Sequence, residues 1–219
     1  MNLDFSKYKI KTDLSIDSKV IKNNKKIIRE ISGDKKVITI RFNEINKRLE
    51  SIFKKELSFF LKQENLLNKK VLVVGLGNSN VTSDSLGIKV VNNIDVKENK
   101  VYALKPSVKG LTGIDTFDII NGVVKEINVD YLILIDSLKT SNLLNLNKII
   151  EITNTYIKPG SGVNSKNKKI SKETINKKII VIGVPTVINI DNLLVSEINI
   201  DDIIDKLSVV ISNGINKSL

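Results

Sequence analysis

The chain has 219 residues, an apolar fraction of 41% and a formal net charge of +11, with neither cysteine nor histidine. The missing cysteines exclude disulfides, thiol nucleophiles and cysteine-based metal sites. The missing histidines exclude Ser-His and Cys-His nucleophile activation and remove the commonest metal ligand, so acid–base chemistry falls to Asp, Glu, Lys, Tyr or water.

The sequence gives no sign of a membrane segment or a nucleic-acid site. No apolar run reaches the roughly 18 residues of a transmembrane helix, and residues 1–7 lack the apolar core of a signal peptide, so we expect a cytoplasmic protein with no membrane partner. The positive charge indicates either an acidic partner or a compositional bias without function, since the chain is rich in Lys, Ile and Asn. Direct nucleic-acid binding is not expected, because Arg29, Arg41 and Arg48 are the only arginines and no basic stripe is interleaved with aromatic residues.

The apolar pattern predicts strands and helices that alternate along the chain. In the first half it predicts strands at residues 37–43, 70–74 and 101–104, and helices at 45–63 and 85–93. In the second half it predicts helices at 116–127 and 200–211, strands at 131–135, 147–152 and 179–182, and loops at 106–115 and 156–170. Gly214 fits a helix C-terminal stop. This order predicts a three-layer α/β/α fold with a largely parallel central sheet.

The most informative segment is an apolar run that ends in Gly75-Leu76-Gly77-Asn78. It opens like a dinucleotide-binding loop, but Asn80 stands where that loop needs Gly or Ala for close helix packing. It also lacks the Lys-Ser/Thr pair of a phosphate-binding P-loop. A nucleotide site is therefore not favoured.

Two carboxylates follow strongly apolar strands. Asp84 comes after the Gly-X-Gly-Asn loop and Asp136 directly follows residues 131–135, so a parallel sheet would bring both to one edge. Two close carboxylates do not ionise together easily: one keeps a proton and acts as an acid while the other activates water. The alternative interpretation is that Asp84 caps a helix and Asp136 caps the segment after its strand.

Two glycine-rich loops offer exposed backbone N–H groups. They are Gly110-Leu111-Thr112-Gly113 and Pro159-Gly160-Ser161-Gly162. Such groups bind a substrate backbone or an oxyanion, and the same composition is also typical of plain turns.

Taken together, several short blocks resemble the germination proteases of spore-forming bacteria. The blocks are residues 71–91, 106–116, 134–138, 159–163, 182–187 and 207–216. The resemblance implies an endopeptidase with two essential aspartates, here Asp84 and Asp136, with Gly110, Gly113, Gly160, Ser161 and Gly162 as candidate substrate or oxyanion contacts. It implies neither a cofactor nor a resident metal. In fold the family is similar to hydrogenase-maturation endopeptidases, whose metal-binding His has no counterpart in this chain.

The resemblance also implies substrates, processing and assembly. Small acid-soluble spore proteins would be the substrates, the location would be the forespore and spore core, and the enzyme would be a tetrameric zymogen. Residues 1–13 would be a propeptide, cut between Asp13 and Leu14, and residues 14–219 a single peptidase domain. The family favours an acidic residue where this chain has Ile10.

The chain departs from the family pattern in several places. It lacks extra sequence that typical members carry after Asp95 and after Leu194, and Lys158 and Asn154 replace a usual His and Asp. An expected Arg is missing from Lys139-Thr140-Ser141. Two alternatives therefore stay open: a metal-dependent endopeptidase of the hydrogenase-maturation type, and an inactive relative that binds spore proteins or DNA.

Overall fold

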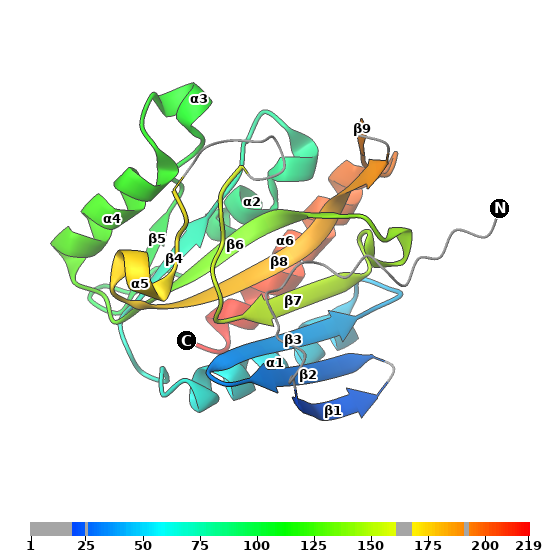
Figure 1. The fold of residues 1–219 in the computed structure, drawn as a ribbon, viewed down its shortest axis with the longest axis horizontal. Coiled ribbons are helices and arrows are strands. Elements are labelled where there is room, and N and C mark those ends of the chain that lie inside the picture. The colour runs from blue at the N-terminus through cyan, green and yellow to red at the C-terminus, as the bar shows by residue number, and fades with distance from the viewer. Residues whose placement is uncertain (1–18, 25, 161–167, 191–192) are drawn as a thin grey trace.

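A computed structural model describes residues 19–24, 26–160, 168–190 and 193–219 (Figure 1). The strands are β1 (Lys19–Asn24), β2 (Ile27–Ser32), β3 (Lys35–Arg41), β4 (Val71–Gly75), β5 (Val101–Leu104), β6 (Tyr131–Thr140), β7 (Ile149–Thr153), β8 (Lys178–Ile190) and β9 (Leu193–Val195). The helices are α1 (Lys47–Gln63), α2 (Leu86–Asn92), α3 (Lys109–Thr112), α4 (Thr116–Ile127), α5 (Lys172–Ile175) and α6 (Ile200–Asn216), with 3₁₀ turns η2 (Thr82–Asp84) and η3 (Leu143–Asn145).

Within the described residues, nine strands form one mixed sheet. Eight of them follow the order β1-β2-β3-β7-β8-β6-β4-β5, and β9 pairs with β8. Strands β8, β6, β4 and β5 are mutually parallel, while β7, β3, β2 and β1 continue the sheet in antiparallel pairs. The carboxyl ends of the parallel strands therefore share one edge, which we call the carboxyl edge. Because the pairing beyond β8 is antiparallel, the start of β7 and the end of β3 lie at the same edge.

Helices cover both faces of the sheet, which confirms the predicted three-layer α/β/α fold. Along β4, Val71 and Val73 point into a core shared with α1, α2 and α6, whereas Leu72 and Val74 point into a second core shared with α4 and α5. Figure 1 shows α1 and α6 behind the sheet and α4 in front of it. Parallel strands buried on both faces carry continuous apolar runs, which explains why their sequence pattern was so clear.

Most predicted elements are present, and the differences have physical reasons. The predicted strand at 101–104 and helix at 116–127 coincide with β5 and α4. Strands β6 and β8 run past their predicted ends because they pair with each other as far as Thr140 and Ile188. The hairpin β1–β2 was not predicted, and the short helix α3 lies inside the predicted loop at 106–115.

The prediction of a helix stop at Gly214 is wrong. Helix α6 continues to Asn216, and Gly214 lies inside it against α1. A Cβ atom at this position would lie 2.3 Å from Cδ1 of Phe53. The glycine therefore serves close helix packing rather than helix termination.

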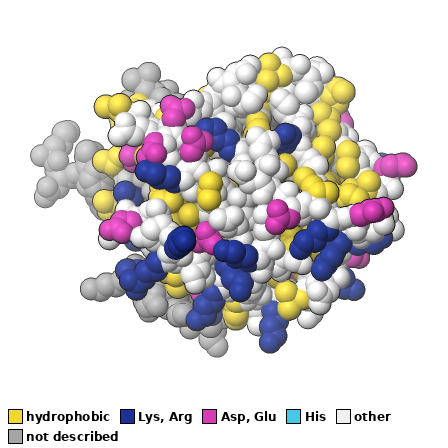
Figure 2. Space-filling model, turned by 180° about the vertical axis from the view of Figure 1, so that it is seen from behind, with side chains coloured by type: hydrophobic (Ala, Val, Ile, Leu, Met, Phe, Trp, Pro, Cys, Tyr) yellow, Lys and Arg dark blue, Asp and Glu magenta, His cyan; other side chains and the backbone are white. Residues whose placement is uncertain are grey.

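The positive charge is distributed unevenly over the surface. Figure 2 shows Lys and Arg gathered on the lower part of the rear face. The exposed side of α1, which lies on that face, carries Lys47, Arg48, Lys54, Lys55 and Lys62. Among the described residues, no helix combines the length and the apolar character needed to cross a membrane.

Candidate active site

Glycines let the loop after β4 fold tightly over the carboxyl edge. Gly77 has φ +116, and a Cβ there would lie 1.9 Å from the Asp84 carbonyl oxygen. A Cβ at Gly87 would lie 2.4 Å from the carbonyl oxygen of Ile135 on β6. Only glycine permits these approaches, because neither position has room for a Cβ and Gly77 also has a positive φ that L side chains rarely adopt. Gly77 thus lets the loop lie against Asp84, and Gly87 lets the start of α2 lie against β6.

Asp84 ends the turn η2 and is held by the loop that it closes. The Asn78 backbone N–H donates to Asp84 Oδ2 at 2.9 Å and also approaches the Asp84 carbonyl oxygen at 3.2 Å. Burial raises the pKa of the Asp84 carboxyl to about 6, and the hydrogen bond from Asn78 partly opposes that rise. No side-chain capping bond is made at the start of α2, whose N-cap position is Ser85. The structure therefore does not support the helix-cap interpretation of Asp84.

Asp136 lies on β6 at the same edge and is only 9% exposed. Burial raises its pKa well above the ordinary value of an aspartate, and the nearby Asp84 carboxylate raises it further. The backbone N–H of Ser137 opposes the rise without cancelling it. In such a pair the more buried carboxyl, Asp136, holds a proton more readily than Asp84, which is the more exposed of the two.

A hydrogen bond fixes the Asp84 turn to the neighbouring strand. Thr186 on β8 is fully buried, and its Oγ1 donates to the carbonyl oxygen of Ser83 at 2.6 Å. The turn η2 also contacts α6 and β6. This role is hard to predict from the sequence, because Thr186 lies in an apolar segment and its partner is a backbone atom.

Another buried carboxylate, Glu151, was not identified from the sequence. Gly183 on β8 pairs with Asp136 on one side and with Glu151 on β7 on the other, so both carboxylates project from the same face of the sheet. The Leu138 side chain fills the space above Gly183, where a Cβ would lie 2.4 Å from Leu138 Cδ1. Burial raises the pKa of Glu151 to about 7, and nearby Glu30 adds to the rise. The sequence feature that could have predicted a buried carboxylate here is a single acidic residue inside the apolar run of residues 149–152.

The other predicted site residues lie in turns or outside the described residues. Gly113 closes α3 with φ +74, and its N–H already donates to the Lys109 carbonyl oxygen at 2.8 Å. Gly110 is the second residue of the same short helix, with open space at its Cβ position, and Gly160 has φ +70. Ser161 and Gly162, and the predicted cut between Asp13 and Leu14, lie outside the described residues.

The described residues contain no group of three or more His, Cys, Asp or Glu side chains arranged to hold a metal ion. Asp84 and Asp136 supply two carboxylates to the site, and Glu151 is separated from them by the side chain over Gly183. The geometry is that of a carboxylate pair with shifted pKa values.

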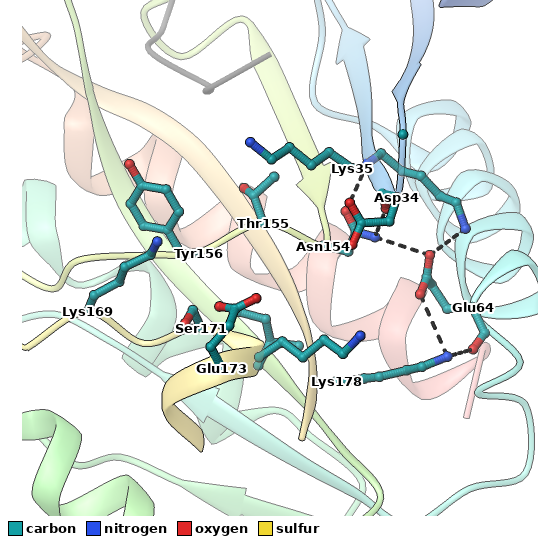
Figure 3. Close-up of a pocket in the computed structure, with 14 residues that line it drawn as sticks. Asp34, Lys35, Glu64, Asn154, Thr155, Tyr156, Lys169, Ser171, Glu173 and Lys178 are labelled. Atoms are coloured by element: carbon teal, nitrogen blue, oxygen red, sulfur yellow. Dashed lines mark hydrogen bonds and ion pairs between the residues drawn. The ribbon is translucent and has the colours of Figure 1, made fainter. Parts of the chain in front are cut away.

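The lysine-lined cavity in Figure 3 lies at the other end of the sheet. It has a volume of about 450 Å³ and is bordered by the starts of β3 and β8 and by the end of β7. Two of its lysines contact Glu64: Lys36 Nζ lies 2.5 Å from Glu64 Oε1, and Lys178 Nζ donates to the Glu64 carbonyl oxygen at 2.6 Å. Lys169 lies over the Tyr156 ring at 3.6 Å. This cavity is therefore separate from the carboxylate pair.

One departure from the family pattern has a local explanation at this cavity. The Asn154 side chain accepts from the Lys36 backbone N–H and donates to the Asp34 carbonyl oxygen, both at 2.8 Å. It also donates to Glu64 Oε1 at 3.2 Å. Asn154 thus ties the β2–β3 turn to the end of β7, far from the carboxylate pair.

The fold and the site together define a three-layer α/β protein with one buried and one half-buried carboxylate at the carboxyl edge of its parallel strands. Comparison with known families places the chain more narrowly. Residues 4–191 match the family model described as germination protease. The chain belongs to the germination protease family.

Named relatives agree with this assignment. The chain is 36% identical to the germination protease of Priestia megaterium, over 85% of this chain and 65% of the relative. It is 41% identical to that of Bacillus cereus strain G9842, over 67% of this chain and 44% of the relative. The chain therefore spans less than two thirds of the length of these relatives.

Among solved structures, the chain is similar to the [NiFe] hydrogenase maturation protease HycI from Thermococcus kodakarensis. The two share 16% identity with a TM-score of 0.46, over 67% of this chain and 92% of the other.

Proposed function

We propose that the chain is an endopeptidase in which Asp84 and Asp136 activate water against a peptide bond. The observation that carries the proposal is the convergence of two carboxylates with raised pKa values at the carboxyl edge. Family membership supports the same reaction class.

The protonation states assign a role to each carboxylate. The Asp84 carboxylate removes a proton from water as the water oxygen bonds to the scissile carbonyl carbon. Protonated Asp136 donates to the carbonyl oxygen, which becomes a hydroxyl in the tetrahedral intermediate. The C–N bond then breaks: the leaving amine takes the proton held by Asp84, and the hydroxyl proton returns to Asp136. Atoms and charges balance without a cofactor.

A pair of substitutions tests the mechanism. Asp84→Asn and Asp136→Asn should each lower kcat/KM for a polypeptide substrate by about 100-fold or more, the usual contribution of one acid–base group. Asp205→Asn is the control. Asp205 lies exposed on α6, where it forms an ion pair with Lys89 of α2, and it is not part of the Asp84–Asp136 pair. If either site variant cleaves at the wild-type rate, the mechanism is wrong.

Small acid-soluble spore proteins are the substrates that we propose. The net charge of +11 favours encounter with an acidic polypeptide, which suits a cut after an acidic residue. Binding of these proteins without cleavage would instead support the inactive, scaffold-like alternative.

We propose further that residues 1–13 are a propeptide removed by cleavage between Asp13 and Leu14. Incubation of the purified full chain at mildly acidic pH, followed by mass spectrometry, should reveal a new N-terminus at Leu14. The same product from Asp84→Asn protein would show that another protease makes the cut.

The metal-dependent alternative makes a different prediction. With two carboxylates as the reacting groups, full activity should survive dialysis against a chelator. Loss of activity on chelation and its return with a divalent ion would favour the metal-dependent mechanism.

A further inference from the structure

A second cavity lies on the same edge of the sheet as the carboxylate pair. Its volume is about 280 Å³, and its lining includes Phe42 after β3, Asn147 before β7, and Ile203 in the first turn of α6. The Phe42 N–H donates to the Lys148 carbonyl oxygen at 2.9 Å, which joins the end of β3 to the start of β7. Helix α6 connects the two places, because its first turn borders the cavity and its body contacts η2.

Asn147 is the unusual residue of this cavity. It is 3% exposed, and among the described residues neither its Oδ1 nor its Nδ2 has a hydrogen-bond partner. Most buried polar atoms in folded proteins are hydrogen-bonded. An unpaired carboxamide beside a cavity therefore indicates that a ligand in the cavity forms the hydrogen bonds. A carboxamide offers one acceptor and two donors, which complements the N–H and C=O of a peptide group.

Further unpaired buried atoms lie on the neighbouring strands. In the described part of the chain they are Tyr131 Oη and Ser137 Oγ on β6 and Asn189 Oδ1 on β8, besides the two atoms of Asn147. Tyr131 begins β6 at the far end of the sheet, whereas Ser137 and Asn189 lie in the halves of β6 and β8 that reach the carboxyl edge. Two of these side chains therefore add unpaired polar atoms towards the edge at which Asn147 lies.

The sheet register gives the spacing between Asn147 and the reacting groups. The Asn147 N–H donates to the Pro185 carbonyl oxygen at 2.7 Å, and Pro185 pairs with Leu138, two residues beyond Asp136. From β6 to β7 the distance is two strand spacings, because β8 lies between them, and Asn147 lies about two residues further along the strand direction than Asp136. The Asn147 and Asp136 Cα atoms are therefore about 12 Å apart. An extended peptide covers that distance in about four residues.

The charges around the cavity fit a polypeptide better than a phosphate group. Lys148 and Lys206 are balanced by Glu44 and Asp202, and Lys206 Nζ lies 2.6 Å from Asp202 Oδ2. Phe42 and Ile203 give the lining its apolar part. A lining of balanced charge does not concentrate phosphate, whereas a mixed apolar and amide surface suits a peptide main chain and one side chain.

We propose that this cavity is a substrate subsite, in which the Asn147 carboxamide binds a peptide group of the polypeptide substrate about four residues from the scissile bond. The proposal rests on the endopeptidase function proposed above. It adds a specificity-determining contact that is separate from the carboxylate pair.

The test replaces the side chain without disturbing the backbone. Asn147 has φ +52, so Asn147→Gly removes the carboxamide and keeps this conformation accessible. The matched control is Asn176→Gly, because Asn176 is exposed at φ +56 at the other end of the sheet. The substrates are an intact small acid-soluble spore protein and a peptide of about four residues around its cut, which reaches only about 7 Å from the scissile bond.

We expect Asn147→Gly to lower kcat/KM about tenfold or more for the intact protein, mainly through KM, and to leave cleavage of the short peptide unchanged. Asn176→Gly should change neither. Equal effects of Asn147→Gly on both substrates, together with a lower melting temperature, would show a structural role and overturn the proposal. Wild-type rates on both substrates would overturn it as well.

A binding measurement separates this proposal from the catalytic one. Fluorescence anisotropy of the labelled spore protein is measured with Asp84→Asn protein and with the Asp84→Asn, Asn147→Gly double variant. A tenfold weaker affinity of the double variant supports the subsite, even if the wild-type chain cleaves nothing and the endopeptidase function fails. Equal affinities overturn the subsite, whatever the wild-type activity.

Discussion

At the scale of single residues, the chemistry depends on where carboxylates are buried. Asp84, Asp136 and Glu151 all have raised pKa values, and burial is the largest cause in each. Asp136 has a carboxylate close beside it from another element, whereas the carboxylate near Glu151 is Glu30 on β2, which is separated from β7 by β3. The first arrangement suits acid–base chemistry, and the second sets a pH dependence of stability.

The pair predicts how activity depends on pH. Because the Asp84 pKa is about 6, lowering the pH through 6 protonates the base, and kcat/KM should fall about tenfold for each further pH unit. At neutral pH and above, activity should hold until Asp136 loses its proton. The measurement is a pH–rate profile of kcat/KM with the intact protein substrate. A profile without a change near pH 6 would contradict the role of Asp84 as the base.

Glu151 predicts a change in stability rather than in rate. Its pKa is raised to about 7 from an ordinary value of 4.5, so the folded state binds the proton more tightly than the unfolded state does. The free energy of unfolding therefore falls as the pH rises from 4.5 to 7 and is constant with respect to this group above 7. Glu151→Gln removes the charge, and at pH 8 it should stabilise the fold by about 2–3 kcal/mol.

Urea unfolding at pH 5 and pH 8 measures this effect. The gain should fall to about 1 kcal/mol at pH 5, where Glu151 keeps its proton in the folded state but has lost much of it in the unfolded state. An equal effect at both pH values would show that the carboxylate charge is not responsible.

At the scale of elements, glycines decide how closely segments approach. Gly77 lets the loop after β4 lie against Asp84, and Gly214 lets α6 lie against Phe53 of α1. Gly122 in α4 has nothing within 4 Å of its Cβ position. The same residue type therefore has opposite consequences on different elements.

This contrast predicts opposite stability changes. Gly214→Ala should destabilise the fold by about 1–3 kcal/mol, because its Cβ would overlap Phe53 Cδ1. Gly122→Ala should stabilise it by up to about 1 kcal/mol, because alanine favours the helix and meets no neighbour. Urea unfolding measures both. Adding Phe53→Leu to Gly214→Ala should recover part of the loss, and no recovery would argue against the contact.

At the scale of the whole molecule, charge and chain length set the partners. The net charge of +11 favours encounter with acidic polypeptides, and much of the exposed side of α1 is basic. The chain spans 65% and 44% of the lengths of its two named relatives. We propose a homo-oligomer by family resemblance, and sedimentation at several concentrations measures its size.

The charge predicts salt dependence. Raising the salt concentration from about 0.05 to 0.5 M shortens the screening length from roughly 14 to 4 Å. The kcat/KM for an acidic spore protein should fall several-fold, mainly through KM, while that for a neutral short peptide should hold. Equal responses of both substrates would mean that the net charge does not steer binding.

The sequence by itself determined the layer architecture, the central strands and the pair Asp84 and Asp136. These are readable because strands buried on both faces need continuous apolar runs, and because the carboxyl ends of parallel strands share an edge. The N-terminal hairpin was not predicted, because its strands lie in the antiparallel part of the sheet and lack continuous apolar runs.

Only the tertiary structure decided how Gly214, Thr186, Glu151 and Asn147 are used. Gly214 fits either a helix stop or a helix contact, and the contact with Phe53 decides between them. The environments of the others depend on strand register across β6, β8 and β7, which pairs residues about 30 to 50 positions apart. The local sequence does not show which distant strands pair, because the hydrogen bonds and the burial between them form only when the chain folds.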